Sequence, residues 1–132
     1  MSIQPALRAA IDLMLMPSKA RLLQRAPLPE QTGELLSIVA GDTDALARAA
    51  KSSGRAPEMV REAATFFVEQ VLLHSESDCY RVLGGTAQCT TAELRRNMAM
   101  MMTWLHPDTD RGGDRSVFAS RVTNAWDTLK TP

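Results

Sequence analysis

The chain has 132 residues, of which 45% are hydrophobic and 23% charged, and its fifteen basic residues are balanced by fifteen acidic ones. This length suits one globular domain, or a small domain with an added helical unit, and the composition is ordinary for a folded protein. The balanced charge disfavours a general nucleic-acid binder, because holding phosphates requires net or clustered positive charge.

Residues 1–76 are predicted to form a helical N-terminal unit. Apolar side chains recur there at helical spacing, and prolines and glycines interrupt the pattern several times. We expect helices over residues 5–16, 18–25, 34–40, 44–52 and 57–74. Asp42 or Thr43 is expected to cap the fourth of these helices, and Gly54 to end it. The fifth helix carries apolar residues on more than one side, so we expect other helices to pack against it on several sides.

Residues 77–132 are predicted to form a second unit, because a hydrophilic stretch at residues 75–78 separates the two halves. We expect three helices in it, over residues 79–83, 91–105 and 116–129. Thr90 and Glu93 have the spacing of a capping box, in which each side chain accepts the backbone N–H of the other residue. The apolar stripes of the last two helices are Leu94, Met98, Met101, Met102, Leu105, Phe118, Val122, Ala125 and Leu129. The predicted fold class is therefore all-α.

Three short motifs follow one another in this second unit. They are Asp-Cys-Tyr-Arg-Val-Leu-Gly at residues 78–84, Thr-Thr-Ala-Glu-Leu-Arg-Arg at residues 90–96, and His106-Pro107-Asp108. With these motifs, residues 78–129 resemble the J-domain, the DnaJ-like module of co-chaperones. The tripeptide alone would be weak support, but here it directly follows one matching helix and precedes another.

The resemblance implies an antiparallel helical hairpin with the tripeptide at its tip. In the family, this tip docks on a DnaK-type chaperone and stimulates its ATP hydrolysis. By that precedent His106, Pro107 and Asp108 form the essential contact, while Arg95 and Arg96 supply the electrostatic contact to the chaperone. Charge complementarity of this kind mainly sets the association rate and the specificity.

The second helix departs from the family pattern where several basic residues are usual. This sequence has Ala99, Met100, Thr103 and Trp104 there. Met100 and Trp104 form a candidate apolar partner surface, unless residues 1–76 cover them, which the surplus of apolar faces in the first unit favours. The departure leaves a second hypothesis open: a J-like interaction or scaffold module that does not stimulate ATP hydrolysis.

Other kinds of site are not supported by the sequence. Cys79 and Cys89 are too far apart for a zinc knuckle, and two cysteines without a disulfide framework suit a reducing compartment. The loop after Asp108 faintly resembles a calcium-binding loop but has Ala119 at the position that needs a glutamate. No catalytic set or phosphate-binding loop appears. We therefore expect no metal, no cofactor and no enzymatic activity.

Location and partners are predicted mostly by what the sequence lacks. It has no run of eighteen apolar residues and no signal-peptide pattern, so we expect a cytoplasmic protein without a membrane partner. Residues 46–61 weakly resemble a helix-turn-helix, but the second helix is acidic and then apolar, which argues against DNA binding. We expect none of the client-binding regions of longer family members. The role expected for residues 1–76 is targeting to a specific protein partner.

Overall fold

The computed structural model describes residues 3–106 and 115–130, and this described part is all-helical, without any strand. The predicted fold class is therefore confirmed. In the first half lie α1 (Pro5–Leu15), η1 (Pro17–Lys19), α2 (Ala20–Arg25), α3 (Thr32–Val39), α4 (Thr43–Ser53), α5 (Pro57–Phe67) and η2 (Val68–Leu72). In the second half lie α6 (Cys79–Val82), α7 (Thr91–Trp104) and α8 (Ser116–Leu129).

Several helix ends are set by the local signals that predicted them. The Asp42 carboxylate accepts the backbone N–H groups of Asp44 and Ala45, both at 3.0 Å, and so caps α4. Gly54 ends the same helix in the left-handed conformation, with φ of 68°. Thr90 and Glu93 make both bonds of the capping box at the start of α7, each at 3.1 Å.

The helix expected over residues 57–74 is not a uniform α-helix. α5 ends at Phe67, and the chain continues through the π-helical turn η2, in which the Leu73 N–H donates to the Val68 carbonyl five residues back. A π turn widens the helix and rotates the side chains that follow it. Here Val68, Val71 and Leu72 are all buried in the wider turn. No periodicity in the sequence marks this change.

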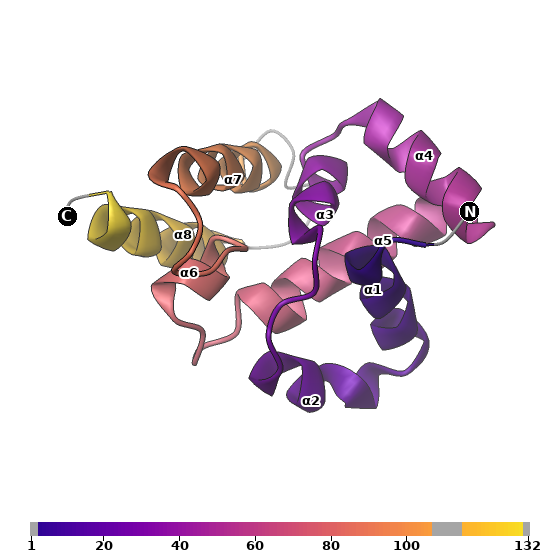
Figure 1. The fold of residues 1–132 in the computed structure, drawn as a ribbon, viewed down its shortest axis with the longest axis horizontal. Coiled ribbons are helices and arrows are strands. Elements are labelled where there is room, and N and C mark those ends of the chain that lie inside the picture. Colours follow the sequence, from indigo (N-terminus) through magenta and orange to yellow (C-terminus); the bar gives the residue numbers. More distant parts are fainter. Residues whose placement is uncertain (1–2, 107–114, 131–132) are drawn as a thin grey trace.

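α5 and η2 lie in the middle of the molecule, with the other helices arranged around them (Figure 1). α1, α3 and α4 all pack on α5, and α2 packs on η2. Phe67 is the largest fully buried side chain of this region. One hydrophobic core continues from here into the second half of the chain, where Leu83, Met101 and Val122 are also fully buried.

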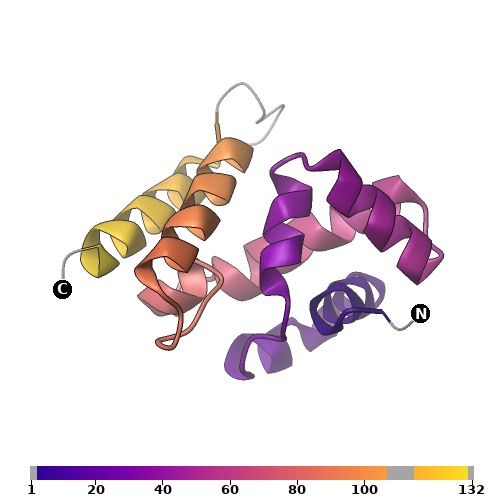
Figure 2. The same ribbon diagram turned by 45° about the horizontal axis from the view of Figure 1, so that its top comes forward.

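α7 and α8 run antiparallel side by side, as Figure 2 shows. α6 packs against α8, and α3 of the first half packs against α7. The buried residues of the α7 segment are Leu94, Met101, Trp104 and, just after the helix, Leu105. Because the pair is antiparallel, the end of α7 and the beginning of α8 lie at the same end of it.

Arg81 of α6 links the two halves of the chain through backbone carbonyl groups. Its guanidinium donates to the carbonyl oxygens of Val71 at 3.0 Å, Ala26 at 2.9 Å and Leu23 at 2.5 Å. Burial lowers the pKa of the Arg81 guanidinium, an effect that nearby Asp78 opposes. The side chain thus satisfies three carbonyl oxygens from two separate segments of the first half.

Candidate functional site

The histidine of the predicted tripeptide lies at the end of α7. His106 is exposed, and its backbone N–H donates to the Thr103 carbonyl at 3.4 Å, so it closes the final turn after the helix. Pro107 and Asp108 lie outside the described residues. His106 is therefore the residue of the predicted tripeptide that the structure describes.

One side of α7 is open to solvent along its whole length. It carries the exposed residues Arg95, Arg96, Ala99, Thr103 and His106, which we call the open face of α7. Three of them, Arg95, Ala99 and Thr103, repeat at intervals of four residues, which keeps them close to one line on the helix. At a rise of 1.5 Å per residue, that line is about 12 Å long, and His106 follows two residues after the helix ends. Its middle is formed by small side chains, which would let a partner approach the backbone closely.

The two arginines of the open face lie next to different helices, Arg95 next to α8 and Arg96 next to α3. The Arg95 guanidinium lies 5.7 Å from the centre of the Trp126 ring of α8, a cation–π contact. Arg96 instead lines a hollow of about 370 Å³ between α7 and α3, together with Glu34 and Ser37. The cations are both accessible, but they do not form one compact positive patch.

Met100 and Trp104 do not form an exposed apolar surface. Met100 is half-buried against α3, where its sulfur lies 3.4 Å from the Ser37 hydroxyl. Trp104 is only 6% exposed, which agrees with the alternative that this side of α7 is covered. α8 packs over the side of α7 that carries Trp104, so this residue is buried in addition to the apolar stripe of the helix. Residues 1–76 therefore reach Met100 through α3, whereas Trp104 is covered mainly from the second half of the chain.

Trp104 is the centre of a cluster that joins the end of α7 to the beginning of α8. Its ring stacks on Phe118 with 6.4 Å between ring centres and 18° between planes. The Arg115 guanidinium lies 5.0 Å from the centre of the same ring, and Arg115 also pairs with Glu69 at 3.8 Å. Burial raises the pKa of the Glu69 carboxyl, and the charge of Arg115 counteracts this rise. The cluster fixes the helix ends that flank the tripeptide.

The other histidine, His74, follows η2 at the junction of the two halves. Its Nδ1 accepts the backbone N–H of Glu76 at 3.3 Å, so a proton on Nδ1 would remove this bond. Desolvation lowers the pKa of His74, Arg81 and Arg121 lower it further, and Glu76 opposes them. These contacts favour the neutral imidazole in the folded protein.

We predict that His74 makes the folded protein less stable in mild acid. The folded pKa lies below the ordinary value of 6.5, so the unfolded chain binds more protons in the interval between them. The contribution of His74 to stability is present above about pH 6.5 and is lost as the pH falls toward the folded value. Thermal unfolding of the wild type and His74→Gln, followed from pH 7.5 to 5.0, tests this. As the pH falls, the melting temperature of the wild type should decrease more than that of the variant. An equal decrease in the two proteins would contradict the prediction.

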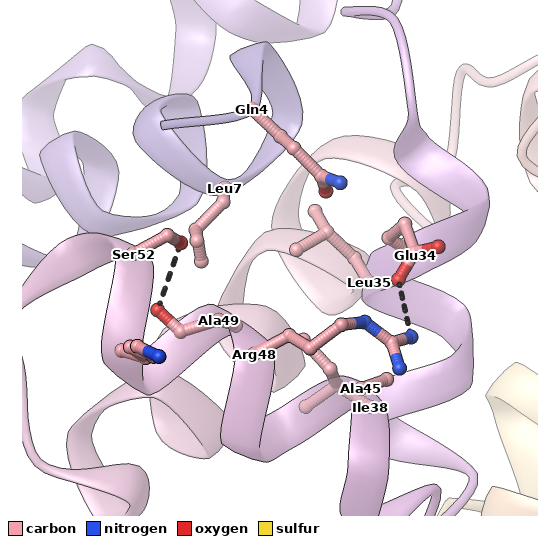
Figure 3. Close-up of a pocket in the computed structure, with 10 residues that line it drawn as sticks. Gln4, Leu7, Glu34, Leu35, Ile38, Ala45, Arg48, Ala49 and Ser52 are labelled. Carbon is pink, nitrogen blue, oxygen red and sulfur yellow. Dashed lines mark hydrogen bonds and ion pairs between the residues drawn. The ribbon is translucent and has the colours of Figure 1, made fainter. Parts of the chain in front are cut away.

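A separate hollow of about 340 Å³ lies between α1, α3 and α4 (Figure 3). Leu7, Leu35 and Ile38 form part of its apolar lining, and the ion pair between Glu34 and Arg48, 3.7 Å long, lies beside it. The described lining contains no histidine or cysteine. It shares Glu34 with the hollow beside Arg96, and we assign no chemistry to it.

The described residues contain neither a metal-binding cluster nor a membrane-spanning helix. Within residues 3–106 and 115–130, no group of three histidine, cysteine or acidic residues is placed to hold a metal ion. None of the helices in this part of the chain is long and apolar enough to cross a membrane. Comparison with family models, with curated proteins and with solved structures found no match to this chain.

The structure adds two residues to the surroundings of the site that the sequence had not assigned, Arg81 and Arg115. Ala99 and Thr103, which the sequence places where the family is usually basic, are exposed beside the predicted arginines. Arg81 and Arg115 act through contacts with residues far away in the sequence, and no local pattern reveals such contacts.

Proposed function

We propose that this protein is a small co-chaperone that binds a DnaK-type chaperone and stimulates its ATP hydrolysis. The observation that carries the proposal is the placement of His106 just after the end of a capped helix, whose last residue, Trp104, stacks on Phe118 near the beginning of an antiparallel partner helix. This is the arrangement expected for a J-domain, in which a rigid hairpin presents the tripeptide. The proposed contact consists of the tripeptide and the open face of α7.

Arg95 and Arg96 are the cations available to meet an acidic chaperone surface. Because they are exposed, their attraction for such a surface should be screened by salt and should act mainly on the association rate. Between them and His106 the open face carries only Ala99 and Thr103. We therefore infer a contact that depends on shape and on the tripeptide more than on charge.

The second candidate function is an interaction or scaffold module without ATPase stimulation. It is favoured by the reduced positive charge of α7. Met100 and Trp104 stand where further basic residues would be usual in the family, and they pack toward α3 and α8. α3 also covers one side of α7, which narrows the surface that a chaperone could use.

Single-turnover ATP hydrolysis by the DnaK-type chaperone from the same cells separates the two functions. We expect the wild type to accelerate hydrolysis and His106→Gln to lose the acceleration, because the tripeptide no longer offers an imidazole at the interface. His74→Gln is a matched control, since it makes the same substitution away from α7 and should keep the acceleration at neutral pH. A folded wild type that gives no acceleration would refute the co-chaperone proposal and favour the scaffold module.

A further inference from the structure

The corner between α1 and α2 exposes several large apolar side chains. Leu15 is 59% exposed, Met16 52% and Leu22 69%. Among the described residues, the other exposed large hydrophobic side chain is Val117 of α8. Single apolar residues on a surface need no explanation, but three within eight consecutive residues require one. We call residues 15–25 the corner segment.

The corner segment is also basic. Lys19, Arg21 and Arg25 are all exposed, and residues 13–29 contain no acidic side chain. None of the three cations forms an ion pair with another residue in the described part of the chain. Leu22 lies three residues from both Lys19 and Arg25, and residues three apart share a helix face. An exposed leucine is therefore flanked by cations, in a chain whose net charge is zero.

The exposure of this segment does not come from a loosely attached helix. The Gln24 side chain donates to the Gln70 carbonyl at 2.7 Å, and Arg81 donates to the carbonyl groups of Leu23 and Ala26. α2 is therefore fixed to η2 and α6 on its inner side. η1 and α2 lie at an outer edge of the molecule in both views (Figures 1 and 2). The apolar and basic side chains are held outward on a protruding edge.

We propose that the corner segment docks on the surface of a lipid bilayer that carries anionic headgroups. Leu15, Met16 and Leu22 would enter the headgroup region, and the three cations would reach lipid phosphates while their aliphatic stems lie along the apolar part. A bilayer accepts a protruding edge without a matching pocket, whereas a protein partner would need an acidic and apolar groove of complementary shape. This docking is peripheral and involves no membrane-spanning helix, and it replaces the expectation from the sequence that the protein has no membrane partner.

Co-sedimentation of the full chain with lipid vesicles tests the proposal. One set of vesicles contains phosphatidylcholine alone, and the other contains phosphatidylcholine with about 30% phosphatidylglycerol, chosen to give a surface charge that attracts basic residues. Circular dichroism verifies that each variant is folded. The apolar variant is L15S/M16S/L22S, the charge variant is K19Q/R21Q/R25Q, and the matched controls are V117S and K51Q/R55Q/R61Q, which change equally exposed residues elsewhere.

We expect the wild type to bind the anionic vesicles at least tenfold more tightly than the neutral ones. Both corner variants should lose most of this binding, and both controls should keep it. The proposal is overturned if the wild type does not bind anionic vesicles, if the control triple variant loses as much binding as the charge variant, or if the apolar variant binds like the wild type. ATPase stimulation in solution should be unchanged in the corner variants, so this test is independent of the proposed co-chaperone function.

Discussion

Replacing Arg81 with methionine is expected to lower the free energy of unfolding by about 3 kcal/mol. Methionine keeps most of the apolar stem but leaves three backbone carbonyl groups without the guanidinium, those of Val71, Ala26 and Leu23. Hydrogen bonds to charged groups contribute roughly 1.5–3 kcal/mol each, and water reaching the half-buried site should recover part of that sum. In urea unfolding, the midpoint should fall by about 2 M if the slope is near 1.5 kcal/mol per M.

The same replacement at an exposed position is the control for Arg81. Arg61→Met, on the outer surface of α5, should change stability by no more than about 0.5 kcal/mol. Arg81→Lys should give an intermediate loss, because lysine keeps the charge but lacks the planar set of donors. In the Arg81→Met variant, backbone amide exchange should be accelerated in α2 and α6 more than in α4. If Arg81→Met lowers the free energy of unfolding by less than about 1 kcal/mol, water satisfies these carbonyl groups as well as the guanidinium does.

Local signals predicted the helix positions well, because they act between residues three or four apart. The capping box of Thr90 and Glu93 and the cap by Asp42 are contained in four consecutive residues each, and the structure has both. The π-helical turn of η2 could not be predicted in this way. It replaces the regular helix in a segment where apolar residues lie on both sides of Glu69 and Gln70, so the hydrophobic pattern does not separate the two geometries.

The candidate site could be predicted only in part, because packing between distant segments decides its surroundings. His106 and the arginines follow from contiguous motifs. Two of the three carbonyl partners of Arg81 lie 55 and 58 residues earlier in the chain, and the side of α7 that α3 covers depends on how the whole first half packs. Trp104 shows the same limit, since spacing along α7 did not reveal that α8 would bury it.

Trp104→Ala is expected to destabilise the protein by about 3 kcal/mol and also to impair ATPase stimulation. The cost follows from removing a large, nearly buried ring and its contacts with Phe118 and Arg115. The loss of function follows from position, because this ring joins the end of α7 to the beginning of α8, next to His106. We expect stimulation to fall about tenfold at a temperature where the variant is still folded, equivalent to about 1.4 kcal/mol of lost coupling.

Two controls separate the effect on stability from the effect on the tip of the hairpin. Trp126→Ala removes a half-buried tryptophan from the same helix pair, next to Arg95 rather than His106, and should keep most of the stimulation despite some loss of stability. Trp104→Phe should recover both properties in part, because a smaller ring can still stack on Phe118. If Trp104→Ala is less stable but stimulates like the wild type, the cluster supports the fold without positioning the tripeptide. If Trp104→Ala stimulates poorly and Trp126→Ala stimulates well, the contact between the end of α7 and the beginning of α8 positions His106 for the chaperone.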